Sequence, residues 1–368
     1  MKHPKFKKGQ GSDFSREVKS RVNNYFSERG ICKQANTGMV LKTILMLSLF
    51  IVPIVLINIG VVEHVALLFA LYLTSGFGMA GIGMGVMHDA IHGSYSKNKT
   101  VNRLLGYSMN MIGANAGVWK IQHNVLHHTY TNIDEADDDI NTPPFLRFSP
   151  NRKWMKAHQY QHIYIWFFYA ISTISWITTK DFIRVHRYWK MGLVGCKGTY
   201  RKQMMQVAIW KALYYTYALI LPMIFLPFSP GVIFLAFLSM HMVTGTCISA
   251  VFQTAHIMPD VEFPKMDEDG AIEKDWAEHQ LETTANYAPG SRVFSWLIGG
   301  LNYQVEHHLF PNICHVHYRK LSEIVRETAA EFGVPYYSHK TFASALVQHT
   351  RKLQNLGQEH SQESPLMH

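Results

Sequence analysis

The stretch MVLKTILMLSLFIVPIVLINIG, residues 39–60, is apolar along almost its whole length. About 20 helical residues cross the hydrocarbon core of a bilayer, so this stretch is long enough to span one. A second such stretch, HVALLFALYLTSGFGMAGIGMGVM at 64–87, begins after only three residues. We therefore predict two spanning helices joined by a tight turn.

The second half of the chain repeats this arrangement. VAIWKALYYTYALILPMIFLPF at 207–228 and GVIFLAFLSMHMVTGTCISAVF at 231–252 are separated by two residues. Charged residues make up 17% of the chain, below the roughly one quarter of soluble domains. The chain is therefore predicted to be an all-α integral membrane protein with four transmembrane helices in two hairpins. Lys42 and Lys211 are expected to extend toward the membrane surface.

Two shorter apolar stretches, 104–118 and 163–177, are interpreted as interfacial helices, although a six-span arrangement stays open. Residues 39–335 form the predicted membrane domain. Residues 336–368 are expected to form a C-terminal helix and a disordered tail. Residues 1–38 form a basic amphipathic segment, in which apolar side chains recur at helical spacing: Phe14, Val18, Val22 and Tyr25. This helix lies either on the membrane surface or in a soluble layer.

Charge predicts the orientation of the spans. The first 21 residues carry seven lysines and arginines, namely Lys2, Lys5, Lys7, Lys8, Arg16, Lys19 and Arg21. Positive residues flanking a span favour the cytoplasm, so both termini are expected there. The polar region after residue 253 then forms a cytoplasmic cap, in which Leu321, Ile324, Val325 and Ala329 mark a helix. The net charge of +9 suits a membrane surface, and nucleic acid is not an expected partner.

Three histidine-rich motifs interrupt the chain: HDAIH at 88–92, HNVLHH at 123–128 and QVEHHLF at 304–310. With the predicted orientation, all three fall on the cytoplasmic side, and so does the single His256 after the last span. The candidate metal ligands are His88, His92, His123, His127, His128, His256, His307 and His308.

Spacing within the motifs supports ligation. His88 and His92, like His123 and His127, are four residues apart and share one helical face. Eight imidazoles exceed the three or four ligands of a zinc site and suit two metal ions, which could be iron, copper or zinc. Carboxylates should accept the remaining imidazole N–H groups. The residues expected in this outer layer are Asp89, Gln304 and Glu306, with the acidic run 134–139 also well placed.

Other histidines have simpler interpretations. A structural or surface role is expected for His64, His158, His162, His186 and His241, whereas His315 and His317 stay open. The basic stretch 180–202 is expected to contact anionic lipid headgroups, with a phosphorylated substrate as the alternative. The four cysteines are far apart and form no metal-binding pair.

Together the three motifs resemble those of the membrane-bound fatty acid desaturases, and most closely the front-end subgroup of linoleoyl-CoA, delta-6 and delta-5 type enzymes. Gln304 stands where other desaturases have the leading histidine of the third motif. The resemblance extends over roughly residues 40–335 and includes HQLETTANY at 279–287 and GGLNYQVEHHLFPNICHVHY at 299–318.

The resemblance implies two Fe²⁺ ions, held by the eight histidines named above, with His256 as the extra ligand after the last span. It also implies an acyl channel, for which the candidate residues are Trp276, His279, Gln280, Thr283 and Thr284. Many front-end desaturases carry a fused cytochrome b5 domain with a His-Pro-Gly-Gly motif, which this sequence does not contain. Electrons are therefore expected from a separate ferredoxin or cytochrome b5.

The expected function is O2-dependent desaturation of a fatty acyl chain, carried by coenzyme A or a membrane lipid, on the carboxyl side of an existing double bond. A di-iron fatty acid or sphingolipid hydroxylase is the alternative, and a metal transporter fits less well because the histidines lie beyond the spans. A bacterial inner membrane is expected rather than the endoplasmic reticulum. The sequence leaves open the position of the new double bond, the acyl carrier and the oligomeric state.

Overall fold

The computed structural model describes residues 5–6 and 12–359, and it is mostly helical. Lys2, Lys7, Lys8 and most of the predicted C-terminal tail lie outside these residues. The chain divides into two compact units. The histidine unit comprises Met1–Lys33, Gln122–Trp166 and Ala250–His368, and the span unit comprises Gln34–Ile121 and Phe167–Ser249.

Four helical stretches among the described residues are long and apolar enough to cross a membrane, which confirms the predicted number. They are Thr37–Asn58, Val65–His92, Lys197–Phe225 and Pro230–His256. The third begins ten residues earlier than predicted, because the basic residues at its start continue the helix instead of preceding it. The second reaches His92, so the HDAIH motif forms the end of a long helix.

The span unit contains mostly helices, several of which include wider π-helical turns. Its elements are α2 (Thr37–Asn58), α3 (Val65–Gly81), η1 (Ile82–Val86), α4 (Met87–His92), α5 (Lys99–Gly106), α6 (Ser108–Met111), α7 (Ala116–Lys120), η4 (Trp176–Lys180), α10 (Asp181–Lys190), α11 (Lys197–Tyr215), η5 (Thr216–Ile220) and α12 (Leu221–Phe225). The helices α9 (Gln161–Ser175) and α13 (Pro230–His256) each continue from one unit into the other.

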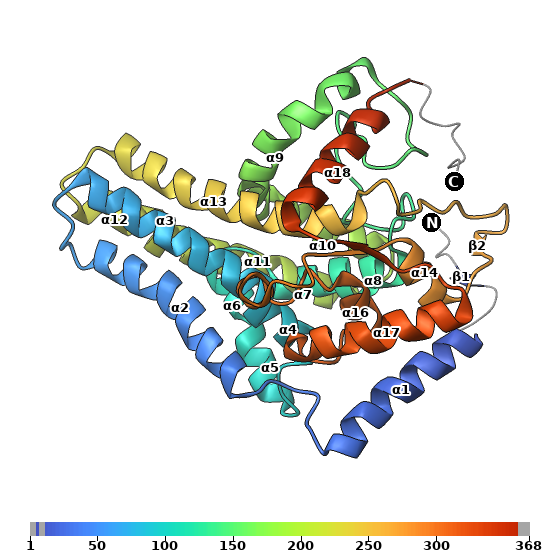
Figure 1. Ribbon diagram of the computed structural model, residues 1–368. Coiled ribbons are helices and arrows are strands. Elements are labelled where there is room, and N and C mark those ends of the chain that lie inside the picture. The colour runs from blue at the N-terminus through green and yellow to red at the C-terminus, as the bar shows by residue number, and fades with distance from the viewer. Residues whose placement is uncertain (1–4, 7–11, 360–368) are drawn as a thin grey trace. The chain divides into compact units, whose positions relative to one another are not determined.

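Small residues allow the apolar helices α2 and α3 to pack side by side (Figure 1). A Cβ atom on Gly78 of α3 would lie 2.5 Å from the backbone nitrogen of Phe50 on α2. Glycine therefore permits an approach that any larger residue would prevent, as is common between membrane helices. Asn36 begins α2 by accepting a hydrogen bond from the Met39 amide at 3.0 Å.

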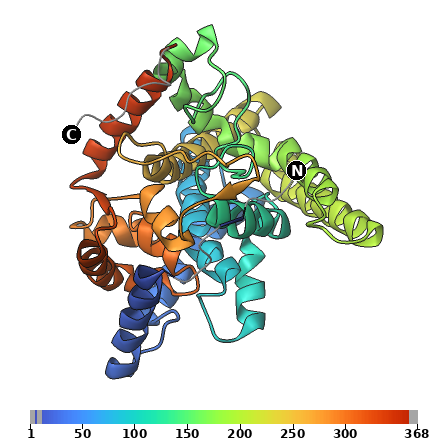
Figure 2. The same ribbon diagram turned by 90° about the vertical axis from the view of Figure 1, so that its right-hand side faces the viewer.

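The expectation that Lys42 and Lys211 extend to the membrane surface is wrong. Both side chains are buried, with relative exposures of 1% and 6%. Lys211 pairs with Asp181 of the neighbouring helix α10 at 2.7 Å and donates to the carbonyl oxygen of Gly113 at 3.1 Å. Figure 2 shows α10 and α11 as yellow-green helices running beside each other. A buried carboxylate thus replaces water as the partner of the Lys211 ammonium.

The histidine unit contains short helices and two pairs of very short strands. Its elements are β1 (Lys5–Phe6), α1 (Asp13–Arg29), η2 (Ile121–His127), α8 (His128–Tyr130), η3 (Lys156–Tyr160), β2 (Ala271–Ile272), α14 (Trp276–Glu282), β3 (Ala285–Tyr287), α15 (Arg292–Leu297), α16 (Gln304–Leu309), η6 (His315–His317), α17 (Tyr318–Phe332), β4 (Tyr337–His339) and α18 (Phe342–Leu356). Strands β1 and β2 pair in parallel, as do β3 and β4. These strands depart from the all-α prediction, because two or three residues are too few to show an alternating pattern.

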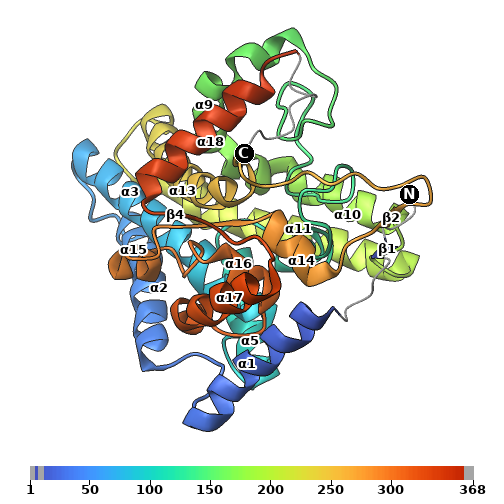
Figure 3. The same cartoon turned by 45° about the vertical axis from the view of Figure 1, so that its right-hand side comes forward.

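The amphipathic helix α1 packs on protein. Its residues Phe14, Val18, Val22 and Phe26 are buried and join one apolar cluster with Leu321 and Val325 of α17. Figure 3 shows α1 beside α17. Arg21 of α1 also pairs with Glu331 of α17 at 2.5 Å. The apolar face of this helix thus packs on protein, which favours the soluble-layer interpretation over the membrane-surface interpretation. The helix predicted around Leu321 is confirmed as α17.

We expect Val22→Ala to destabilise the histidine unit by about 1–3 kcal/mol, because it leaves a cavity in the α1–α17 cluster. Thermal unfolding of the detergent-purified protein, followed by circular dichroism, should show a lower midpoint. Asn24→Ala, on the exposed face of the same helix, is the control and should leave the midpoint unchanged. An unchanged midpoint for Val22→Ala, with weaker binding to vesicles, would instead favour the membrane-surface interpretation.

Candidate metal centre

Three buried imidazoles from different parts of the histidine unit converge on one point. His127 ends the π-helical turn η2, His256 ends α13, and His308 lies on α16. All three are 0% exposed, and their possible ligand atoms lie within 4.8 Å of one another. This separation is small enough for one metal ion to bind all three.

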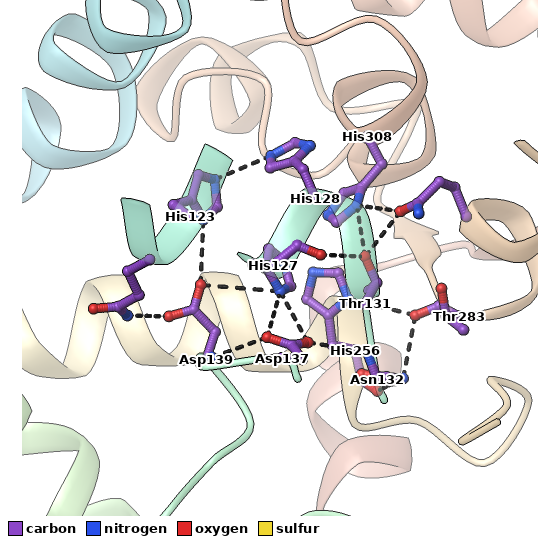
Figure 4. A network of polar contacts seen from close by, with 12 residues as sticks. His123, His127, His128, Thr131, Asn132, Asp137, Asp139, His256, Thr283 and His308 are labelled. Carbon is purple, nitrogen blue, oxygen red and sulfur yellow. Dashed lines mark hydrogen bonds and ion pairs between the residues drawn. The ribbon is translucent and has the colours of Figure 1, made fainter. Parts of the chain in front are cut away.

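A hydrogen-bond acceptor holds the Nδ1 atom of each of these rings (Figure 4). The Nδ1 of His127 lies 3.0 Å from Asp137, that of His256 lies 3.4 Å from the carbonyl oxygen of Thr283, and that of His308 lies 2.8 Å from Oε1 of Gln280. These oxygens can only accept, so each Nδ1 carries the proton. The lone pair of each neutral ring is then on Nε2, where a metal ion can bind it.

The Nε2 atoms of His127 and His256 are buried and have no hydrogen-bond partner among the described residues. Leaving a buried polar atom unpaired costs about 1–3 kcal/mol. A metal ion would remove this cost, so the arrangement fits metal binding better than a purely structural role.

Asp137 controls the His127 ring electrostatically. Burial lowers the pKa of His127, but the charges of Asp137 and Asp139 and the hydrogen bond to Asp137 together raise it by more, so the net shift is upward. The Asp137 carboxylate itself accepts hydrogen bonds from the backbone N–H groups of Asn132 and Asp139, both at 2.9 Å. The carboxylate is thereby fixed in place, and it fixes the ring in turn.

A second group of three imidazoles lies in the same unit. The Nε2 atom of His128 is 3.2 Å from that of His123 and 3.0 Å from that of His307, and the latter two are 3.4 Å apart. Two imidazole nitrogens bound to one ion at about 2.1 Å lie roughly 3.0 Å apart at a right angle and roughly 3.4 Å apart at the tetrahedral angle. The three spacings therefore fit ligands that share one ion.

Two rings of this second group also have polar partners at Nδ1. Nδ1 of His123 is 3.3 Å from Asp139, which also accepts a hydrogen bond from the Gln122 amide. Nδ1 of His307 is 3.3 Å from the hydroxyl of Tyr318.

The rings of His123 and His127 stack with their centroids 5.1 Å apart, as four-residue spacing predicts, although the backbone there is a π-helix. Such wider turns recur at functional sites because they redirect side chains.

His88 and His92 belong to the span unit. Their rings lie 4.8 Å apart on α4, and Trp119 of α7 packs against them at 5.6 and 5.8 Å. The carboxylate of Asp89 is buried, and one of its oxygens lies 3.6 Å from Nδ1 of His88. The two histidines therefore form a preorganised pair on one helical face.

The other residues expected in the outer layer occupy different environments. Glu306 is buried and accepts hydrogen bonds from Asn286 at 2.8 Å and Tyr336 at 3.0 Å, so the partners described for it are not imidazoles. Burial raises the pKa of Glu306 to about 7, against the opposing effect of these hydrogen bonds. Gln304 is also buried, and its side-chain amide has no hydrogen-bond partner among the described residues.

The five residues expected in the acyl channel are close in sequence but differ in their contacts. Gln280 and Thr283 hold His308 and His256, as described above. Trp276 donates to the carbonyl oxygen of His128 at 3.1 Å. His279 and Thr284 are fully buried. Burial lowers the pKa of His279 to about 3, and its ring packs edge-on against Phe6. Their role in a channel stays a prediction.

Two polar residues that sequence reasoning missed complete the site. Thr131 donates to Gln280 at 2.8 Å, and its hydroxyl lies 3.2 Å from Nδ1 of His308. Asn132 adopts a left-handed backbone conformation, with φ at 59°, and donates to the carbonyl oxygen of His256 at 2.9 Å. They lie three and four residues after the last histidine of HNVLHH, and that proximity is the signal that could have identified them.

The arrangement can hold metal ions through neutral nitrogen donors and can offset their charge with carboxylates one layer out. Imidazole suits iron, copper and zinc, so these donors alone do not select the metal. Burial keeps bulk water away, which strengthens every charge interaction at the site. Metal-assisted chemistry on an apolar substrate is consistent with this environment.

Comparison with known proteins identifies a family. A model of the family described as fatty acid desaturase matches residues 63–340. The chain is 35% identical over 359 residues to the sn-1 linoleoyl-lipid 6-desaturase of Synechocystis sp., covering 95% of this chain and 96% of that protein. It is 36% identical to the sn-1 linoleoyl-lipid 6-desaturase of Arthrospira platensis, covering 92% and 91%. An acyl-lipid (8-3)-desaturase of Physcomitrium patens is 34% identical, covering 95% of this chain and 72% of that protein.

We expect Asp137→Asn to weaken metal binding about 10–100-fold, because the His127 ring loses the carboxylate that orients it. Bound metal in the purified protein, measured by elemental analysis during titration with a chelator, reports this change. Glu135→Gln, an exposed residue of the same loop, is the control and should bind metal like the parent protein. Equal loss in both variants would show that the loop as a whole, and not the Asp137–His127 contact, governs binding.

Proposed function

Because the chain belongs to the fatty acid desaturase family, we propose that it is a di-iron enzyme that desaturates acyl chains of membrane lipids. It is a fatty acyl desaturase, as its similarity to several curated acyl-lipid desaturases shows. One observation supports the metal assignment. Oxygen acceptors hold the Nδ1–H groups of His127, His256 and His308, so the Nε2 atoms of these rings face one another and are available to a metal ion. The family supplies the choice of iron.

We propose that eight histidines hold the two Fe²⁺ ions. Within the histidine unit, one ion would be held by His127, His256 and His308, and the other by His123, His128 and His307. The assignment of His88 and His92 to the same centre rests on their spacing and on the family resemblance. Bound iron would supply activation of O2 and removal of hydrogen from unactivated C–H bonds, which protein side chains cannot perform.

The residues of this chain would tune and protect that chemistry. Asp137 and Asp139 hold the imidazoles in one orientation, and their negative charges compensate an ion whose direct ligands are neutral. Neutral oxygens of Thr131 and Gln280 contact the His308 ring, and that of Thr283 contacts the His256 ring. The buried positions of the six histidines exclude water from reactive species.

We propose a membrane acyl-lipid as the substrate, in preference to an acyl-coenzyme A. The relatives from Synechocystis sp. and Arthrospira platensis are named for a linoleoyl-lipid, and the relative from Physcomitrium patens is named an acyl-lipid desaturase. The names of the first two relatives also support insertion between an existing double bond and the carboxyl end. Trp276, His279 and Thr284 remain our candidates for residues that contact the acyl chain.

The membrane arrangement is part of the proposal. Four apolar helices support association with a membrane. We propose that they form two hairpins, with both termini and the histidine-bearing cap in the cytoplasm, and that the membrane is a bacterial inner membrane. A separate ferredoxin or cytochrome b5 would supply electrons, and the net charge of +9 would attract such an acidic partner.

A hydroxylase with the same metal centre is not favoured, because the similar proteins described above are desaturases. The products of the two reactions differ. A hydroxylase leaves oxygen on the acyl chain, whereas a desaturase leaves a double bond and no added oxygen.

We expect the full chain, expressed in a host without polyunsaturated lipids and fed linoleate, to introduce a double bond on the carboxyl side of those already present. Mass spectrometry of the lipids locates the bond. His307→Ala should abolish the product, because it removes a ligand from the second group. His64→Ala, an exposed histidine at the start of α3, is the control and should keep it. Hydroxylated lipid instead of a new double bond would overturn the proposal.

A further inference from the structure

The span unit contains a pocket of about 480 Å³, and none of the described residues that line it is a histidine. Residues of α4, α5, α7 and α11 line it. Three of them are cationic, namely Lys99, Arg103 and Lys120, and none of the described residues that line it is acidic. A pocket with three positive charges and no carboxylate favours an anionic ligand.

Two asparagines strengthen this preference. The side-chain oxygen of Asn110 accepts a hydrogen bond from the backbone N–H of Ala116 at 3.2 Å. The side-chain oxygen of Asn115 accepts one from the backbone N–H of Val118 at 3.0 Å. Because these oxygens already accept hydrogen bonds from the backbone, the side-chain NH2 groups are the atoms that can donate hydrogen bonds to a ligand. Both asparagines line the pocket, so they add neutral donors to the three cations. Donors of both kinds suit the oxygens of a phosphate.

The surroundings of the pocket point to a membrane ligand. Leu104 on α5 is 65% exposed, and Met205 and Ile209 on α11 are 58% and 50% exposed. Tyr107 and Trp210, which both line the pocket, stack with ring centroids 6.2 Å apart. Exposed apolar side chains beside paired aromatic rings and cations are typical of the boundary between lipid tails and headgroups. The ligand would therefore enter from the lipid side.

The pocket also adjoins the helix of the first histidine motif. Ala90 and Ile91 line it, and they lie between His88 and His92 on α4. The helix α7, which also lines it, carries the Trp119 ring that packs on both histidines. An acyl chain attached to a headgroup in this pocket would thus begin next to that histidine pair.

We propose that this pocket binds the phosphate-bearing headgroup of a membrane glycerolipid and thereby selects the lipid whose acyl chain is desaturated. Lys99, Arg103 and Lys120 bind the phosphate, while Asn110 and Asn115 donate to its oxygens. The role in substrate selection rests on the proposed function, whereas headgroup binding does not. Coenzyme A also carries phosphates, but the exposed apolar side chains around the pocket favour a ligand embedded in the membrane.

The test compares three linoleoyl compounds bound to the purified full chain. The probes are dilinoleoyl phosphatidylglycerol, uncharged dilinoleoylglycerol and linoleoyl-coenzyme A, and native mass spectrometry measures their dissociation constants. The test variant is Lys99→Gln/Arg103→Gln/Lys120→Gln. The matched control, Arg319→Gln/Arg326→Gln/Lys340→Gln, removes three charges from exposed positions of the histidine unit that do not line the pocket. A charge-retaining variant, Lys99→Arg/Arg103→Lys/Lys120→Arg, shows that the site tolerates substitution.

We expect the test variant to lose affinity for phosphatidylglycerol by at least tenfold and up to about 100-fold, since each cation near a membrane contributes roughly fivefold. Its affinity for dilinoleoylglycerol should not change, and the control and charge-retaining variants should bind like the parent protein. Equal binding of phosphatidylglycerol by test variant and parent would overturn the proposal. So would a loss confined to linoleoyl-coenzyme A, or an equal loss in the control.

Desaturation of the same probes, measured in parallel with an electron donor present, separates the two proposals. Charge-dependent binding of phosphatidylglycerol without any desaturation would support the headgroup site and contradict the proposed function. Desaturation of all three probes at rates that the test variant does not alter would contradict the headgroup site alone. Faster desaturation of phosphatidylglycerol than of dilinoleoylglycerol, with the difference lost only in the test variant, is the expected result.

Discussion

The candidate metal centre depends on one constraint, which is that a buried neutral imidazole carries a single proton and must have an acceptor for it. In the histidine unit, oxygens of Asp137, Thr283 and Gln280 accept that proton at Nδ1, so the Nε2 atoms face one another. The rings come from η2, α13 and α16, and the acceptor Gln280 comes from α14, so all four elements must be in place before the three rings point at one ion. The three acceptors therefore set the orientation in which these rings can bind an ion.

The sequence predicted the features that local patterns determine. Four apolar stretches of sufficient length identified the long helices, and histidines four residues apart identified the clusters. It did not predict which oxygen serves which ring. Glu306 is adjacent to His307 in sequence but accepts from Asn286 and Tyr336, whereas Asp137 reaches His127 because the backbone turns sharply at Asn132. Such pairings depend on the conformation of the backbone between the two residues, which their separation in the sequence does not determine.

A similar reason explains why the sequence left two interpretations open for α1 and why the expectation for the two lysines was wrong. An amphipathic helix has the same pattern whether its apolar face lies on lipid or on another helix, and only the partner helix α17 distinguishes them. A lysine within an apolar stretch gives the same sequence pattern whether its side chain reaches the membrane surface or pairs with a carboxylate from another helix. For Lys211, that carboxylate is 30 residues away in the sequence.

The Lys211–Asp181 pair has a consequence for how the protein is made. A lysine near the middle of a membrane helix costs about 2.5–3.5 kcal/mol during insertion, and the stretch Lys197–Phe225 has the lowest hydropathy of the four long helices. Asp181 leaves the ribosome before Lys211, so its carboxylate is already present when the lysine arrives. Insertion of this helix is thus coupled to the earlier helix α10. The two helices are expected to enter the membrane together, because Asp181 lowers the cost of inserting Lys211.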